Sequence, residues 1–214
     1  QFDTVFDWSS TNGMLGAAEM CNGSGDCRKT QLSGGTMCPS YMATRNEKDS
    51  TRARANMLRQ ALTEGPKGAA NVFENPDVAE VLDLCLSCKG CKKECPSTVD
   101  MAKLKAEFTQ HYFDANGIPL RTKLIANFVS SQKIASYAPR LWNYAFKTKP
   151  MRKILNRSVG FHPDRSIPLL SRQTFAQWFQ AHTPHASAGT VGSVWLFNDE
   201  YTNYNDAHLG IKAV

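Results

Sequence analysis

Four closely spaced cysteines constrain this chain more than any other feature of its sequence. They follow the spacing C-x2-C-x2-C-x3-C-P, formed by Cys85, Cys88, Cys91, Cys95 and Pro96. Short turns with this spacing hold a [4Fe–4S] cluster, and the fourth cysteine of such a run ligates another cluster in proteins that carry two. The pattern therefore predicts an iron–sulfur site and requires further cysteines elsewhere in the chain.

A second group of cysteines lies upstream, as this pattern requires. It consists of Cys21, Cys27 and Cys38, and Cys38 is also followed by a proline, Pro39. All seven cysteines thus belong to two groups that each end in Cys-Pro. Residues 21–40 are also rich in glycine, which allows the backbone to wrap tightly around a cofactor.

Structural zinc and disulfide bonds are the other common uses of clustered cysteines. Zinc sites commonly take their ligands from two separated C-x2-4-C pairs, whereas here three cysteines follow one another at x2 intervals. A disulfide framework is disfavoured because the number of cysteines is odd and no stretch resembles a secretion signal. We therefore expect metal-ligating cysteines in a reducing compartment.

The composition is that of an ordinary globular protein, with 42% hydrophobic residues. No stretch approaches the roughly 18 apolar residues of a transmembrane helix. The formal net charge of +6 by itself fits a nucleic acid or an anionic membrane surface. Nucleic acid is disfavoured, because the basic residues are dispersed and thiolate-bound clusters add negative charge that this count ignores. We also expect the chain to be a piece of a longer protein, since it begins at Gln1.

Apolar residues recur at helical spacing through most of the chain, which predicts a mainly α fold. Helices are expected at Met14–Met20, Ser50–Leu62, 76–84, 101–108, 120–136, 139–157 and Phe175–Gln180. Asp49 or Ser50 is expected to cap the second of these helices, and Asp100 the fourth. The stretch Val191–Phe197 instead reads as a buried strand.

Four segments around the cysteines resemble one known module. They are EMCNGSGDCRK (19–29), GGTMCPSY (34–41), EKDSTRAR (47–54) and LCLSCKGCKKECP (84–96). In this combination they resemble the α-helical ferredoxin module of FAD-linked dehydrogenases, which is related to the iron–sulfur subunits of glycolate oxidase and anaerobic glycerol-3-phosphate dehydrogenase. The nearest resemblance is to fused proteins, similar to D-lactate and D-2-hydroxyglutarate dehydrogenases, in which an FAD-binding domain precedes the module. Residues 194–206 (VWLFNDEYTNYND) are similar to the opening of the domain that follows it there.

The resemblance implies an α-helical ferredoxin fold with two cysteine-bearing loops, followed by the start of an α/β domain. Residues 1–160 would form the iron–sulfur domain with a helical extension, and residues 161–190 an irregular connection. Residues 191–214 would begin a truncated C-terminal α/β domain. FAD would bind in a preceding domain that is not in this chain.

The resemblance also implies how the cysteines are shared between clusters. One [4Fe–4S] cluster would be held by Cys38, Cys85, Cys88 and Cys91. A second would draw on Cys21, Cys27 and Cys95. A regular first motif would have a cysteine three residues after Cys21, where this chain has Ser24, and serine oxygen is a harder and usually less effective iron ligand than thiolate. The second site would then hold a cluster with a non-cysteine ligand, a three-iron cluster, or none.

The function that the resemblance implies is electron transfer within an oxidoreductase. Electrons from a flavin reduced by a D-2-hydroxyacid (lactate, 2-hydroxyglutarate or glycolate) would pass through one or two clusters to a quinone or a soluble carrier. The protein would be cytoplasmic or peripheral at the inner face of the cytoplasmic membrane. No catalytic residue is predicted on this chain. A structural or redox-sensing cluster and a heterodisulfide-reductase-like subunit are the alternatives.

Charged residues near the cysteines have two interpretations. Lys89, Lys92 and Lys93 lie between the cluster cysteines, and cations there would favour the more negative reduced state or dock an acidic partner. Arg52 and Arg54 lie in a segment of the resemblance, near the first cluster. For all five residues, an ordinary solvated position on a loop or helix surface is the alternative.

Overall fold

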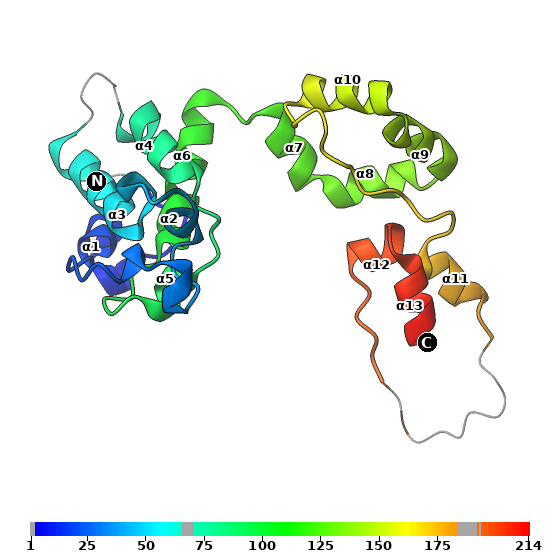
Figure 1. Cartoon of the computed structure of the whole chain (residues 1–214), viewed down its shortest axis with the longest axis horizontal. Helices are drawn as coiled ribbons and strands as arrows, with labels where there is room; N and C mark the ends of the chain where they lie inside the picture. The colour runs from blue at the N-terminus through cyan, green and yellow to red at the C-terminus, as the bar shows by residue number, and fades with distance from the viewer. Residues whose placement is uncertain (1–2, 66–70, 184–191, 193) are drawn as a thin grey trace. The chain divides into compact units, whose positions relative to one another are not determined.

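The chain divides into two compact units, Gln1–Ile118 and Pro119–Val214 (Figure 1). The computed structural model describes residues 3–65, 71–183, 192 and 194–214. Within these ranges the only regular elements are α-helices and short 3-10 turns, so the expected mainly α fold is confirmed. None of the helices in the described part of the chain has the length and apolar character needed to cross a membrane.

The first unit is a set of short helices around one core. Its α-helices are α1 (Gly13–Glu19), α2 (Pro39–Thr44), α3 (Thr51–Glu64), α4 (Pro76–Asp83), α5 (Gly90–Glu94) and α6 (Met101–Asn116). α3 packs against α1, α4 and α6 and so occupies the centre of the unit. The core between them includes Leu58 of α3, Leu82 of α4, and Leu104 and Phe108 of α6. Each such buried side chain stabilises the fold by roughly 1.5–3 kcal/mol.

Two helices, α3 and α6, start at capping residues expected from the sequence, and α4 starts at a capping residue that was not predicted. Ser50 Oγ accepts a hydrogen bond from Ala53 N (3.0 Å) at the start of α3. Asn75 and Asp100 cap α4 and α6 in the same manner. These contacts satisfy N–H groups that have no partner inside the helix. The side chain of Asp49, the alternative cap of α3, instead accepts a hydrogen bond from Thr44 Oγ1 (2.7 Å).

A buried carboxylate fastens the N-terminal segment to α6. The Glu107 side chain is fully buried and accepts hydrogen bonds from Val5 N (2.7 Å), Phe6 N (2.9 Å) and Trp8 Nε1 (3.0 Å). His111 Nε2 lies 2.8 Å from the same carboxylate. Burial alone raises the pKa of Glu107, but these hydrogen bonds outweigh it and leave the pKa below its usual value of 4.5. The fold therefore stabilises the charged form.

The second unit is also helical in its described residues. Its helices are α7 (Leu120–Ala126), α8 (Phe128–Ala135), α9 (Pro139–Lys147), α10 (Lys149–Val159), α11 (Phe175–Ala181), α12 (Glu200–Tyr204) and α13 (Ala207–Ala213). The helices expected at 120–136 and 139–157 are each divided in two, at Asn127 and at Thr148. In the second case the reason is Pro150, which cannot continue a helix but fits the first turn of a new one.

Two asparagines tie the connecting segment of the second unit to its helices. Asn156 is buried, and its Nδ2 donates to three carbonyl oxygens between residues 162 and 165. Asn143 exchanges two hydrogen bonds with the backbone of Leu170, both 2.8 Å long. Side chains thus satisfy five backbone groups between residues 162 and 170, in the first part of the segment expected to be an irregular connection.

The strand expected at Val191–Phe197 is not formed. Two of its residues lie outside the described residues, and the others have no regular structure. Val194, Trp195 and Phe197 are almost entirely exposed, and Trp195 is 101% exposed. A strand needs a neighbour to pair its backbone N–H and C=O groups, and the described residues contain no other strand. An α/β domain beginning in this region stays a prediction.

Replacing Glu107 by glutamine should lower the free energy of unfolding by about 1–3 kcal/mol. The amide keeps the shape of the side chain but directs a donor toward groups that are themselves donors. Urea unfolding followed by circular dichroism at about pH 7 measures the effect. Glu80→Gln is the matched control, because it neutralises a carboxylate of an exposed ion pair with Lys48, and it should change stability little.

The same pair of proteins tests the charge on Glu107. Because the folded-state pKa is lowered, this carboxylate stabilises the fold above about pH 4.5, and the contribution is lost as the pH falls through the folded-state pKa. The difference in the free energy of unfolding between wild type and Glu107→Gln should therefore become smaller below about pH 4.5. A gap of equal size at about pH 7 and about pH 4 would contradict this role of the charge.

Candidate metal centre

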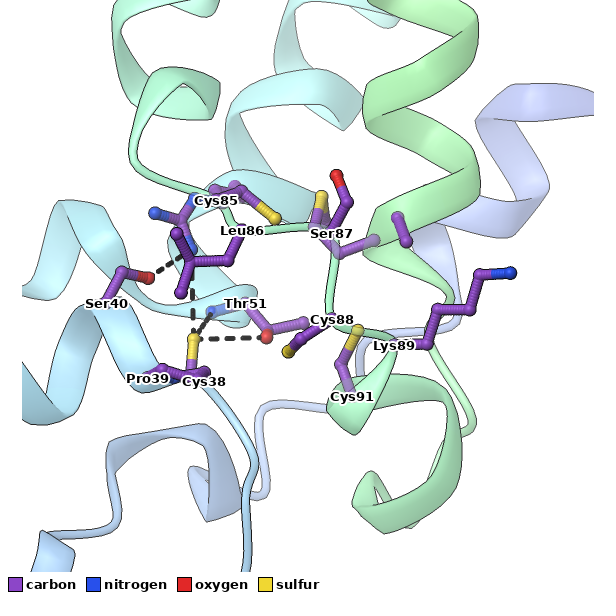
Figure 2. Close-up of a pocket in the computed structure, with 13 residues that line it drawn as sticks. Cys38, Pro39, Ser40, Thr51, Cys85, Leu86, Ser87, Cys88, Lys89 and Cys91 are labelled. Atoms are coloured by element: carbon purple, nitrogen blue, oxygen red, sulfur yellow. Dashed lines mark hydrogen bonds between the residues drawn. The ribbon is translucent and has the colours of Figure 1, made fainter. Parts of the chain in front are cut away.

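Four cysteines from two distant segments line one pocket of the first unit. Cys38 comes from the start of α2, whereas Cys85, Cys88 and Cys91 come from the turn after α4 and the beginning of α5. In Figure 2, Cys38 lies on one side of the pocket, and Cys88 and Cys91 lie on the other. The structure thus places the four cysteines that the family resemblance assigns to one cluster in the lining of one pocket, although no three His, Cys, Asp or Glu side chains of the described residues are grouped closely enough to hold a metal ion.

Two core helices complete the walls of this pocket. α3 contributes Thr51 and Arg54, and α6 contributes Met101 and Ala102. Because α3 and α6 are packed through the core, the pocket has a rigid floor. The turn that carries Cys88 is on the outer side, where Cys88 is exposed.

The backbone around the pocket adopts a conformation that is unusual for residues other than glycine. Cys38, Ser87 and Lys89 have φ angles of 62°, 53° and 61°. This left-handed region costs such residues roughly 1–2 kcal/mol each, and residues held in it concentrate at functional sites. Here it bends the chain sharply at Cys38 and inside the turn between Cys85 and Cys91, which directs both segments around the same space.

Hydrogen-bond donors surround the sulfur of Cys38. Thr51 N lies 3.1 Å from the sulfur, Thr51 Oγ1 lies 3.4 Å from it, and Arg54 Nη1 donates to it at 3.8 Å. The Asp49 carbonyl oxygen, 3.4 Å away, accepts the proton of the thiol form. Thr51 is the first residue of α3, where the helix dipole is positive. Thr51 and Arg54 thus direct an N–H group, a hydroxyl group and a guanidinium at one sulfur atom.

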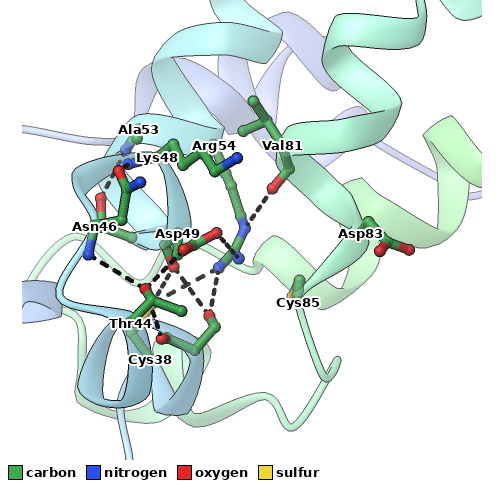
Figure 3. Close-up of polar contacts among 12 residues, drawn as sticks. Cys38, Thr44, Asn46, Lys48, Asp49, Ala53, Arg54, Val81, Asp83 and Cys85 are labelled. Atoms are coloured by element: carbon green, nitrogen blue, oxygen red, sulfur yellow. Dashed lines mark hydrogen bonds and ion pairs between the residues drawn. The ribbon is translucent and has the colours of Figure 1, made fainter.

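Arg54 is the largest of the fully buried side chains among the described residues, with 1% exposure. Its Nε donates to Val81 O (2.9 Å), and its Nη1 also donates to Ser40 Oγ (3.0 Å) (Figure 3). Nη2 forms an ion pair with Asp49 Oδ1 at 3.8 Å and has no hydrogen-bond partner among the residues described. The guanidinium therefore joins the start of α2, the segment before α3 and the end of α4.

Glu94 connects the two cysteine loops on the outer side. Its Oε1 accepts from Thr36 N (2.7 Å) and Thr36 Oγ1 (2.8 Å), and its Oε2 accepts from Met37 N (3.0 Å). The hydrogen bond from Thr36 N is the largest of the contacts that lower the pKa of Glu94, so the ionised form is favoured. A carboxylate of α5 thus holds the two residues that directly precede Cys38.

The contact between these loops is close, and each loop has a glycine at the point of contact. A Cβ atom on Gly35 would lie 2.6 Å from Glu94 Oε2, and Gly35 also has a φ of 82°. On the opposite loop, a Cβ atom on Gly90 would lie 3.1 Å from Thr36 O. Gly35 thus leaves room for the Glu94 side chain, and Gly90 leaves room for Thr36 of the other loop.

The second cysteine group is not gathered into one pocket. Cys21 lines a separate, polar depression formed with residues of α1 and α3, while Cys27 and Cys95 are buried and do not line it. Burial raises the pKa of the Cys27 thiol. Ser24 is exposed.

The chemistry of the first pocket fits an iron–sulfur cluster. Such clusters are held by cysteine thiolates, and no carboxylate is found among the described residues that line the pocket. Burial raises the pKa of the Cys91 thiol, which a bound metal would offset, because a coordinating thiol loses its proton. Soft thiolate ligands without hard oxygen donors favour iron–sulfur clusters, zinc or copper(I) over magnesium or calcium.

The charged residues singled out in the sequence have different surroundings. Lys89 lines the pocket, and Lys92 pairs with the carboxylate that caps α6 at 3.0 Å. Arg52 forms a partly exposed ion pair, as a helix-surface arginine would. For Arg54 the solvated position is wrong. The signal that marks its burial is its place on α3, four residues before Leu58 and on the same helical face.

Comparison with known proteins supports this view of the site. Residues 20–100 match the family model described as the 4Fe-4S dicluster domain. The chain is 26% identical to a D-2-hydroxyglutarate dehydrogenase of Escherichia coli K12 over 236 aligned residues, which cover 91% of this chain and 23% of that protein. The corresponding protein of Haemophilus influenzae is 24% identical, and the alignment covers 88% of this chain and 22% of that protein. The corresponding protein of Pseudomonas putida is 27% identical, and the alignment covers 74% of this chain and 18% of that protein.

These findings confirm the resemblance to the iron–sulfur part of FAD-linked dehydrogenases. The chain is related to D-2-hydroxyglutarate dehydrogenases over most of its own length. It spans less than a quarter of the length of these curated relatives. No solved structure matches the chain significantly.

Replacing Glu94 by alanine should loosen the loop before Cys38 and reduce the iron that the chain retains. The reason is that two backbone N–H groups and one hydroxyl lose their shared acceptor. Iron per chain after anaerobic reconstitution and desalting measures the loss. Lys93→Ala is the matched control, because Lys93 is an exposed neighbour on the same short helix. Equal iron retention in both variants would show that this tether does not support the site.

Proposed function

We propose that this chain is the electron-transfer module of an FAD-linked D-2-hydroxyacid dehydrogenase. In this proposal Cys38, Cys85, Cys88 and Cys91 are the ligands of one [4Fe–4S] cluster. The observation that carries it is the meeting of these four cysteines in one pocket, although they come from segments far apart in sequence. The match of residues 20–100 to the 4Fe-4S dicluster domain supports the same assignment.

When bound in this pocket, the cluster supplies one-electron transfer. The protein residues hold it and limit its contact with water. Thr51 and Arg54 direct donors at the sulfur of Cys38, and these contacts hold it in place. Met101 and Ala102 give the pocket an apolar floor. Cys88 and its turn are exposed, so an electron donor or acceptor can approach from that side.

A second cluster, drawing on Cys21, Cys27 and Cys95, is part of the proposal. The dicluster match supports two sites. Ser24 stands where the regular motif has a cysteine, so the site takes a non-cysteine ligand, holds three irons, or is empty. The relatives that carry a comparable segment are named D-2-hydroxyglutarate dehydrogenases.

In the whole protein we place FAD in a domain before this module. Substrate oxidation there would reduce the flavin, and the electrons would leave through the module to a quinone or a soluble carrier. D-2-hydroxyglutarate is the first substrate to test because of the names of the relatives, with D-lactate and glycolate next. A cytoplasmic protein and one bound at the inner face of the membrane both agree with this role.

Metal analysis is the first test. Iron, acid-labile sulfide and zinc are measured per chain after anaerobic purification, with EPR on the dithionite-reduced protein. About four irons and one reduced-state signal are expected for one cluster, and about seven or eight irons with interacting signals for two. Stoichiometric zinc without sulfide would overturn the proposal.

Replacing Cys88 by serine in the full-length protein tests the electron path. Flavin reduction by the hydroxyacid should remain, because the substrate site is outside this module. Electron transfer to the external acceptor should fall by at least about tenfold, since serine is a poorer ligand for iron. Stopped-flow absorbance follows the flavin, and steady-state acceptor reduction follows the output. Unchanged acceptor reduction would favour a cluster with a structural or redox-sensing role.

A further inference from the structure

Two oppositely charged side chains are buried directly beside the candidate ligand Cys38. Arg54 is 1% exposed and Asp49 is 2% exposed. Removing such charges from water costs several kcal/mol per ion unless other groups compensate. Ligation by cysteine alone does not require either charge, so their presence here needs a separate explanation.

The contacts of Arg54 are not those of an arginine whose main role is to pair with Asp49. A strong pair places two guanidinium N–H groups on the two carboxylate oxygens, whereas this ion pair measures 3.8 Å. Nε and Nη1 are instead directed at Val81 O, Ser40 Oγ and the Cys38 sulfur. Neighbouring groups therefore fix the guanidinium so that its charge faces the sulfur.

Asp49 is held in place independently of Arg54. Thr44 Oγ1 donates to its Oδ2 at 2.7 Å, and its Oδ1 faces the guanidinium. A role as the cap of α3 does not explain why the Asp49 carboxylate is buried here, because Ser50 caps that helix. The three groups form a series in which the carboxylate contacts the arginine and the arginine contacts the sulfur (Figure 3).

We propose that Arg54 and Asp49 are positioning residues that set the reduction potential of the site at Cys38 in opposite directions. This inference rests on the proposed [4Fe–4S] cluster at Cys38, Cys85, Cys88 and Cys91. Arg54 makes reduction more favourable, and Asp49 limits that effect. The pair thereby adjusts how readily this module accepts an electron from the flavin and gives it up again.

The physical reason is the charge that reduction adds. One electron makes the site more negative by one unit, and the potential of such sites depends on nearby charge, hydrogen bonds to sulfur and exposure to solvent. A buried cation in contact with a ligand sulfur stabilises the added charge, because low-dielectric surroundings screen it weakly. A buried carboxylate farther along the same series opposes the reduction and partly cancels the cation.

The test is a redox titration of the reconstituted protein with dithionite, followed by EPR. Arg54→Gln should make reduction at least about tenfold less favourable, a shift of about 59 mV to more negative potential for one electron. Asp49→Asn should shift the potential in the positive direction. Lys48→Gln is the matched control, because it removes one positive charge from an exposed ion pair next to Asp49 in sequence, and it should leave the potential unchanged.

Further variants separate tuning from folding. Arg54→Lys keeps the charge but loses the planar fork, and it should stay nearer to the wild-type potential than Arg54→Gln. If two clusters are present, the signal that Cys88→Ser abolishes is the one that should shift. A merely structural role would lower iron content or stability in both Arg54→Gln and Asp49→Asn without shifts of opposite sign.

The outcomes distinguish this inference from the proposed function. Wild-type protein without iron and sulfide would overturn the proposed function itself. Wild-type protein with a cluster, but with potentials in Arg54→Gln and Asp49→Asn equal to that of Lys48→Gln, would overturn only the inference. If Arg54→Gln does not take up iron, the reduction potential of Asp49→Asn is the test. A potential of Asp49→Asn that is not more positive than that of wild type would then overturn the inference.

Discussion

The candidate ligands come from two segments that are far apart in sequence, and the first unit is organised around holding these segments together. Cys38 begins α2, whereas its three partners follow α4. Arg54 joins these segments from inside, through Cys38 and the end of α4. Glu94 joins them from outside, through the residues before Cys38. Because α3 packs against both α4 and α6, the inner connection rests on the core of the unit.

Much of the site was visible in the sequence because its ligands have a characteristic chemistry and spacing. The cysteine pattern predicted an iron–sulfur site, and the family resemblance predicted which four cysteines share a pocket. The helix starts at Ser50, Asn75 and Asp100 were also predictable, since each has a side chain that can accept from the N–H groups of the first turn. Such signals are local, and they do not depend on how distant parts of the chain pack.

The features that the sequence did not reveal depend on packing. The position of Arg54 on the helical face of Leu58 is a sequence signal for its burial, but that burial also requires acceptors from α2 and α4, which only the structure shows. Asp49 and Ser50 are both plausible caps, and the contacts of the Asp49 carboxylate with Thr44 Oγ1 and Arg54 account for its inward position. The apolar run Val191–Phe197 resembles a strand, yet strand formation requires a pairing partner that apolar residues cannot supply by themselves.

The close approach of the two cysteine loops has a consequence for any attempt to transplant this centre into another protein. Gly35 leaves room for a side chain of the opposite loop, and Gly90 leaves room for the backbone at Thr36. The shape of each loop therefore depends on the other loop, and neither loop can be transferred to another protein by itself. A designer who grafts the Cys85–Cys95 turn alone would transfer most of the sulfur ligands and lose the shape that holds them. The smallest transferable part is the pair of loops together with α3, whose first turn supplies donors to Cys38.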